Sequence, residues 1–116
     1  MTSVEVSAGP GSLDLAIYRG DTWTEQWDFA DNDGPIPLPG TWRAQIRHAA
    51  NSPTTLASMT LTVDAEAGTI TATLDADTTA GLMQSHAVWD LEQTDDGTVR
   101  TWLAGNVAIR SDVTRD

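Results

Sequence analysis

The sequence predicts an all-β protein, a single antiparallel β-sandwich of about seven strands with one short helical turn. Apolar residues recur at every second position along most of the chain, and turn residues such as Asp33-Gly34 and Asp96-Gly97 interrupt this pattern repeatedly. A period of two is typical of strands with one buried face, because successive side chains of a strand point to opposite sides. We expect a domain at residues 13–110 and a C-terminal tail at residues 111–116.

Residues 1–12 are predicted to form a flexible arm, because Gly9-Pro10-Gly11 separates Val4 and Val6 from the first strand pattern. Such an arm can add a strand to the open edge of a neighbouring sandwich, where backbone groups lack partners. We therefore expect Val4 and Val6 to contact an adjacent subunit.

Five strands are predicted between the arm and residue 74. In chain order, their inward-facing residues are Leu13, Leu15 and Ile17; Trp23, Trp27 and Phe29; Trp42, Ala44, Ile46 and His48; Met59, Leu61 and Val63; and Ile70, Ala72 and Leu74. The prolines at positions 35, 37 and 39 cannot donate to a strand ladder and indicate an extended connection or a sheet edge. Residues 75–82, which begin with Asp75 and approach their end at Gly81, predict the helical turn.

The last element is a hairpin at residues 87–109, in which Asp96-Gly97 supplies the positive φ of a tight reversal. On both arms of the hairpin, apolar residues recur at alternate positions and are expected to face the core. They are Ala87, Trp89, Leu91, Val99, Leu103, Val107 and Ile109. Trp23, Trp27, Trp42 and Trp89 are expected in the core. Trp102 falls on the opposite parity, so we expect it to point outward and to contact a partner, as Trp commonly does at interfaces.

Composition limits the classes of partner. With 17 acidic and 6 basic residues, the net charge of -11 disfavours nucleic acid, whose phosphates are bound by Lys and Arg. The absence of Cys excludes disulfides, thiolate metal sites and cysteine nucleophiles. No apolar run approaches the ~20 residues of a membrane span, and the N-terminus does not resemble a secretory signal. We expect a soluble chain, made in the cytoplasm, with no membrane partner.

The sequence contains no complete pattern of residues for a catalytic or metal-binding site. His48 and His86 lie on different predicted segments, and no spacing places a nucleophile and a carboxylate beside either. Asp31 to Gly34 has the beginning of a calcium loop but not its closing bidentate Glu, so a simple turn is favoured. Arg19-Gly20-Asp21 matches an integrin-type adhesion tripeptide, but a Gly-Asp corner between two strands accounts for it without a ligand. We expect no enzyme activity, no catalytic, cofactor-binding or metal-binding residue, no cofactor and no small-molecule substrate.

Several stretches together resemble the immunoglobulin-like β-sandwich of bacteriophage baseplate upper proteins and related minor tail proteins. They are RGDTW (Arg19 to Trp23), LPGTWRAQIR (Leu38 to Arg47), the helical turn ending in Gly81-Leu82, and WDLEQTDDG (Trp89 to Gly97). The resemblance covers about residues 13–110. It implies an immunoglobulin-like fold that serves as a structural module and has no catalytic residues to transfer.

Three functions stay open from the sequence. The resemblance favours a structural virion protein at the phage tail tip or baseplate, assembled in the host cytoplasm through contacts with other virion proteins, such as a homo-oligomeric ring or lattice. The acidity and small size equally suit a capsid decoration protein on the outer head surface. A carbohydrate- or receptor-binding module is a further alternative, because exposed aromatic residues on sandwiches can stack on sugars.

Overall fold

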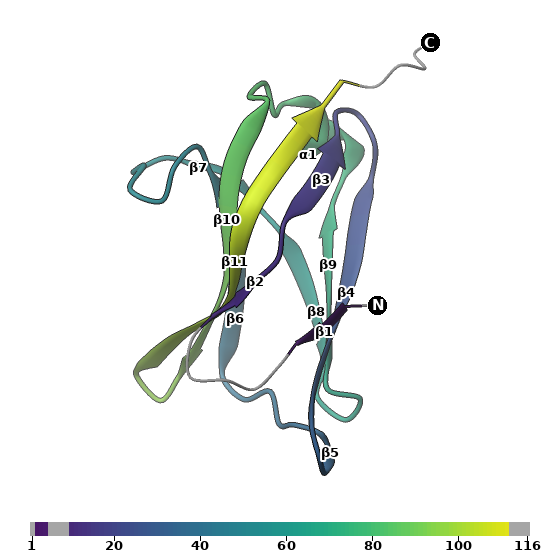
Figure 1. The fold of residues 1–116 in the computed structure, drawn as a ribbon, viewed down its shortest axis with the longest axis vertical. Helices are drawn as coiled ribbons and strands as arrows, with labels where there is room; N and C mark the ends of the chain where they lie inside the picture. The colour runs from purple at the N-terminus through teal and green to yellow at the C-terminus, as the bar shows by residue number, and fades with distance from the viewer. Residues whose placement is uncertain (1, 5–9, 112–116) are drawn as a thin grey trace.

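Two β-sheets pack face to face as a β-sandwich with one short helix (Figure 1). The structure is a computed structural model, and it describes residues 2–4, with the backbone alone at Thr2, and 10–111. About 62% of the described residues lie in strands and 5% in helix, which confirms the predicted all-β class. Among the described residues, no helix is long and apolar enough to cross a membrane.

The first sheet has the order β1-β4-β9-β8, and the short β5 pairs with β4 beyond this path. Its strands are β1 (Thr2–Val4), β4 (Trp23–Asp31), β5 (Gly34–Pro35), β8 (Thr60–Asp64) and β9 (Thr69–Leu74). The second sheet has the order β2-β11-β10-β6-β7, with β3 also beside β11. Its strands are β2 (Gly11–Ser12), β3 (Leu15–Tyr18), β6 (Thr41–Arg47), β7 (Thr55–Ser58), β10 (His86–Asp95) and β11 (Thr98–Arg110).

This strand order is the immunoglobulin-like one. In such sandwiches one sheet has strands A, B, E and D, and the other places strand C′ beside strands C, F and G. Here β4, β9 and β8 correspond to B, E and D, whereas β11, β10, β6 and β7 correspond to G, F, C and C′. The expectation of purely antiparallel sheets is wrong at the N-terminus, because β1 runs parallel to β4, and β2 and β3 run parallel to β11.

The N-terminal strands also correct the prediction of a free arm. Val4 is 4% exposed, lies opposite Phe29 in β4 and belongs to the core of its own chain. Gly11 and Ser12 pair with β11 of the same chain. Burying the Val4 side chain against its own first sheet removes apolar surface from water and leaves little of it for a neighbouring subunit. Val6 lies outside the described residues.

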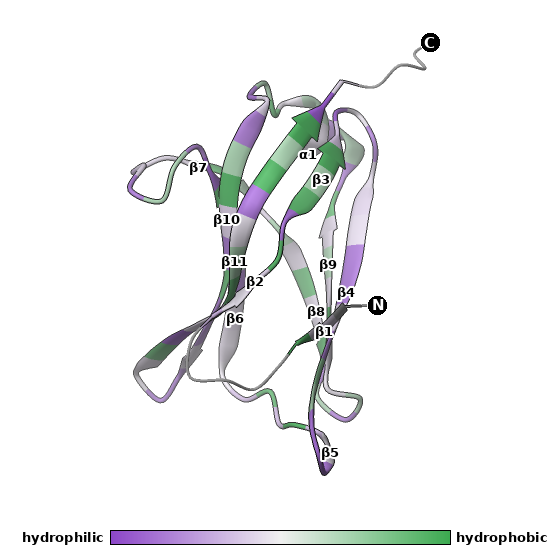
Figure 2. Cartoon of the chain, in the orientation of Figure 1, coloured by the Kyte–Doolittle hydropathy of each residue, from purple (hydrophilic) through white to green (hydrophobic). Residues whose placement is uncertain are grey.

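Aromatic residues hold the two sheets together. Trp27 of β4 stacks on Trp89 of β10 with ring centroids 5.2 Å apart. These are the two strands that a disulfide joins in antibody domains, so ring stacking takes this place in a chain without Cys. Trp27 and Trp89 are buried as predicted, and Trp23 and Trp42 are half-buried against the core. Figure 2 shows hydrophobic and hydrophilic bands along β11.

A β-bulge in the last hairpin overturns the prediction for Trp102. Leu91 pairs with Leu103 and Glu92 pairs with Thr101, so Trp102 is an extra residue in β11. A bulge reverses the in-and-out alternation on one side of it. Trp102 is therefore 7% exposed and points into the core, whereas Val99, expected inside, is 59% exposed.

Two other expected core positions lie at the surface. Val63, on the edge strand β8, is 40% exposed. His48 is exposed because β6 ends one residue earlier, at Arg47. Val63 is the penultimate residue of β8, and His48 follows the last residue of β6.

The predicted helical turn is α1 (Ala76–Ala80). The Asp75 carboxylate caps it by accepting a hydrogen bond of 2.8 Å from the backbone N–H of Thr78. Hydrogen bonding to the side chain of Thr78, and then to its backbone N–H, lowers the pKa of Asp75. The hydroxyl of Thr79 is buried and donates to the carbonyl of Asp21 at 2.7 Å, which fixes α1 to the corner that precedes β4.

Candidate functional site

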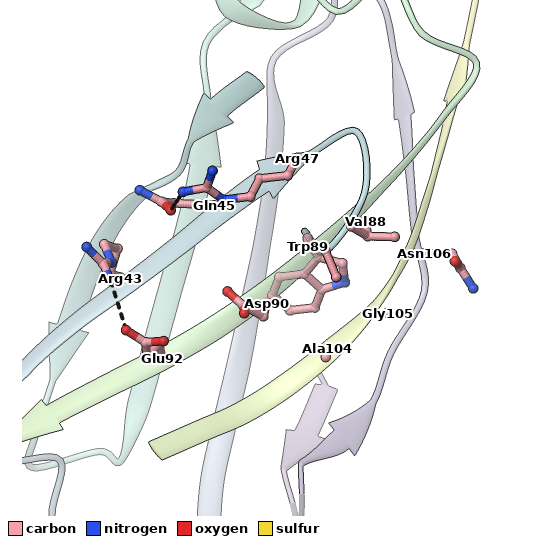
Figure 3. A pocket seen from close by; sticks show the side chains of 11 residues that line it. Arg43, Gln45, Arg47, Val88, Trp89, Asp90, Glu92, Ala104, Gly105 and Asn106 are labelled. Atoms are coloured by element: carbon pink, nitrogen blue, oxygen red, sulfur yellow. Dashed lines mark hydrogen bonds and ion pairs between the residues drawn. The ribbon is translucent and has the colours of Figure 1, made fainter. Parts of the chain in front are cut away.

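The outer face of the second sheet has a concave pocket of about 470 Å³ (Figure 3). It lies across three neighbouring strands, β6, β10 and β11. Its lining residues are Arg43, Gln45, Arg47, Ala50, Val88, Trp89, Asp90, Glu92, Ala104, Gly105 and Asn106. Pockets of this volume are within the range that accommodates small ligands or protruding side chains.

The residues that β11 contributes to the pocket include the small Ala104 and Gly105. Ala104 lies opposite Asp90 of β10, which lies opposite Gln45 of β6. Gly105 is required for a steric reason: a Cβ at this position would collide with the backbone carbonyl oxygen of Leu13. The chain that passes closely beneath Gly105 is itself held by Trp89, whose Nε1 donates to that same carbonyl at 2.8 Å.

Two arginines on β6 form the opposite side of the pocket, and each has a partner. Arg43 forms an ion pair of 2.9 Å with Glu92, between Nη2 and Oε1. Arg47 donates to the carbonyl of Ser52 at 2.9 Å and to Oε1 of Gln45 at 3.1 Å. Both guanidinium groups are therefore held in place by their own chain.

Asp90 differs from these residues. Among the described residues, none donates a hydrogen bond to its carboxylate or forms an ion pair with it. Partial burial raises the pKa of Asp90, and the negative charge of Glu92 raises it further, while Arg43 and Arg47 act in the opposite direction. Asp90 is thus an incompletely compensated carboxylate in the middle of the pocket.

The residues predicted as contact sites do not lie in this pocket. Val4 and Trp102 are buried in the core, and Val6 is outside the described residues. The sequence did contain a signal for the pocket, since Asp90 and Glu92 alternate on the polar face of one strand as Arg43 and Arg47 do on another. Recognising it required knowing that β6 and β10 are neighbours, and the local pattern does not specify strand pairing.

The histidines and the Asp31 turn, considered above for catalysis and calcium binding, are explained by the structure without such a role. His86 lies 3.2 Å from Asn106, between Nε2 and Oδ1, and His48 is exposed elsewhere. The backbone N–H of Asp33 donates to the Asp31 carboxylate at 2.9 Å, as in an ordinary turn. Within residues 2–4 and 10–111, no group of three or more His, Cys, Asp or Glu side chains could hold a metal ion.

Arg19 of the Arg19-Gly20-Asp21 corner has a role that sequence reasoning missed. Its guanidinium donates to the backbone carbonyls of Leu82, Met83 and Gln84, the last two at 3.0 Å. The backbone N–H of Gly20, a residue with φ of 87°, donates to Thr79 Oγ1 at 3.0 Å. The tripeptide therefore joins the β3–β4 corner to α1 and to the loop that follows it.

Comparisons with known proteins assign no family. No family model and no curated protein matches the chain. Among solved structures, InlP of Listeria monocytogenes is 22% identical with a TM-score of 0.48, and the match covers 87% of this chain but only 27% of InlP. The N-terminal domain of ORF48 of phage TP901-1 is 12% identical with a TM-score of 0.46, over 95% of this chain and 99% of that domain. At these scores neither likeness assigns a function.

Proposed function

We propose that this chain is a structural virion protein of a bacteriophage, a minor tail, tail-tip or baseplate component that works through protein–protein contacts. The sequence stretches that resemble phage baseplate and minor tail proteins support the phage role. The observation that carries the contact role is the concave, charged pocket on the open face of β6, β10 and β11. A sheet face of this kind can receive a neighbouring protein without any change in the sandwich.

In this proposal the pocket binds and does not catalyse. Both arginines of the pocket have partners within the chain. Arg43 forms an ion pair with Glu92, and Arg47 donates hydrogen bonds to Gln45 and to the Ser52 carbonyl. Such fixed charges give a partner surface specificity and orientation. We propose no cofactor, no metal and no enzymatic reaction, and the net charge of -11 favours protein partners over nucleic acid.

The proposed partners are other virion proteins, in a ring or lattice that can include further copies of this chain. Because an acidic chain facing the packaged genome would be repelled, we propose a position on the tail or on the outer surface of the particle. Capsid decoration is the alternative within the same class, and it differs from a tail role chiefly in copy number.

Quantitative mass spectrometry of purified virions tests this proposal. A tail role predicts a few to tens of copies per particle, on the order of tail-ring symmetry, with the major capsid protein as the internal standard. Hundreds of copies, comparable to the major capsid protein, would replace the tail role with capsid decoration. Absence of the protein from purified particles would refute both.

A glycan-binding role gains less support from the geometry. Trp89 lines the pocket but is only 3% exposed, so it offers a sugar ring no face for stacking. Tyr18, 47% exposed at the end of β3, is not among the residues that line the pocket.

A further inference from the structure

We propose that the pocket on β6, β10 and β11 docks a basic side chain, Lys or Arg, from a protein other than this one, and that Asp90 is the residue that pairs with it. This inference deepens the contact function proposed above and rests on it. It specifies the chemistry of the partner surface, which the fold class alone does not.

The charged groups of the pocket differ in whether they have partners within the chain. Arg43 and Glu92 satisfy each other at 2.9 Å, and Arg47 is held by Gln45 and by the Ser52 carbonyl. Asp90 stands between these groups without a hydrogen bond from any described residue. A partly buried carboxylate is stabilised when an opposite charge approaches to within about 4–6 Å. A cation supplied by a partner would therefore interact more favourably with Asp90 than with any other group in the pocket.

The shape of the pocket also favours a long basic side chain beside Asp90. Ala104 lies directly opposite Asp90 on β11, so the carboxylate is flanked on that side by a single methyl group. On the other side, Gln45 lies opposite Asp90 on β6 and is held by Arg47. The space of about 470 Å³ can hold a long side chain together with part of the loop that presents it.

The charge of the whole chain indicates a different protein as the partner. The sequence has no Lys, and its 6 Arg residues face 17 acidic residues, so two copies repel each other. Arg43 and Arg47 belong to the pocket itself, Arg19 is held by the loop after α1, and Arg100 stacks on Trp102 at 3.7 Å. Arg110 is exposed at the end of β11, but it belongs to a chain with a net charge of -11. A partner with a basic loop is complementary to this surface, and a second copy is not.

The test is an NMR titration of the isotope-labelled full chain with the peptide acetyl-Gly-Ser-Arg-Gly-Ser-amide. A second peptide with citrulline in place of arginine has nearly the same shape without the charge. We expect chemical-shift changes centred on Val88, Asp90 and Ala104 with the arginine peptide and at least tenfold weaker binding of the citrulline peptide. Equal responses to both peptides, no response, or changes centred elsewhere would overturn the inference.

Two variants locate the interaction. Asp90→Asn removes the charge with little change in shape, and Ala104→Met fills the space beside it without changing any charge. Each should weaken peptide binding at least tenfold. Asp28→Asn, on the first sheet, removes the same charge away from the pocket and should leave binding unchanged. Circular dichroism melts establish that each variant is folded; if Asp90→Asn and Asp28→Asn bind alike, Asp90 is not the docking group.

Two further outcomes separate this inference from the proposed function. Peptide binding by a protein that is absent from purified virions would refute the virion role and leave the pocket chemistry intact. A protein present in virions that does not bind the arginine peptide would refute the pocket chemistry alone. Shifts in the same residues on addition of N-acetylglucosamine, without a response to the arginine peptide, would replace the basic side chain with a glycan.

Discussion

Trp102 is fixed by contacts on several sides. Its ring meets the edge of Phe29 at 5.6 Å and lies 6.0 Å from the ring of Trp42. Its Nε1 donates to Gln93 at 2.9 Å, and Gln93 donates in turn to the Pro39 carbonyl at 2.8 Å. These contacts join the β10–β11 hairpin to the proline-containing connection before β6.

The first prediction follows from this burial. Trp102→Ala should lower the free energy of unfolding by roughly 3–5 kcal/mol, because it leaves a cavity and removes the partner of a buried amide. Val99→Ala, on the exposed side of the same strand, should change it by less than about 0.5 kcal/mol. Urea unfolding measures both. If Val99→Ala costs more than Trp102→Ala, the bulge is wrongly placed.

The second prediction concerns Asp90 and pH. Folding raises the pKa of Asp90, so the folded state holds this proton more tightly than the unfolded state does. Any stability that this group contributes is present below the unfolded pKa of about 3.9 and is lost as the pH rises through the raised folded value.

At pH 7, Asp90→Asn should therefore increase the free energy of unfolding, by roughly 0.5 kcal/mol for a partly exposed charge. Near pH 3, where Asp90 is protonated in both states, the advantage over the natural chain should disappear. Denaturant titrations at the two pH values measure this difference. A loss of stability in the variant at pH 7 would mean that the carboxylate already has a strong partner in the free protein.

At the scale of elements, the corner at Arg19 organises one end of the sandwich. Arg19→Met keeps much of the side-chain length but removes the donors to three carbonyls, so it should lower the free energy of unfolding by about 1–2 kcal/mol. It should also speed amide hydrogen exchange at residues 82–85. Arg110→Met, at the exposed end of β11, is the matched control. Equal effects of the two substitutions would show that the guanidinium contacts contribute nothing.

The N-terminal strand gives a further test. Val4→Ala should lower the free energy of unfolding by about 1.5 kcal/mol, because two buried methyl groups are lost. Ser3→Ala, on the exposed side of β1, should have little effect. The measurement is made on the isolated chain at low concentration. An unchanged stability in Val4→Ala would restore the flexible arm that the sequence predicted.

Sequence patterns were sufficient for elements that form through local contacts. The two-residue period located the main strands, Asp75 and Gly81 bounded α1, and Asp96-Gly97 located the hairpin turn, where Asp96 has φ of 51° and Gly97 of 80°. The bulge at Trp102 could not be predicted, because it depends on the register between β10 and β11. The pocket depends likewise on β6 lying beside β10, which long-range packing decides.

At the scale of the whole molecule, the two sheets have different outer faces. The outer face of β4, β9 and β8 includes a ladder of threonines, in which Thr24 pairs with Thr73 and Thr73 with Thr60. The outer face of β6 and β10 instead carries the arginine and carboxylate groups of the pocket (Figure 3). If the chain functions through protein contacts, this asymmetry predicts that one face binds the neighbouring protein and the other does not.

Site-specific photo-cross-linking in assembled particles tests this claim most directly. A benzophenone amino acid is placed at Asn106, on the rim of the pocket, and in a matched protein at Thr62, on the exposed face of β8. We expect cross-links from position 106 to a different virion protein, next to a Lys or Arg in that protein, and few from position 62. Cross-links from position 62 alone, or from neither position in particles that contain the protein, would contradict the account.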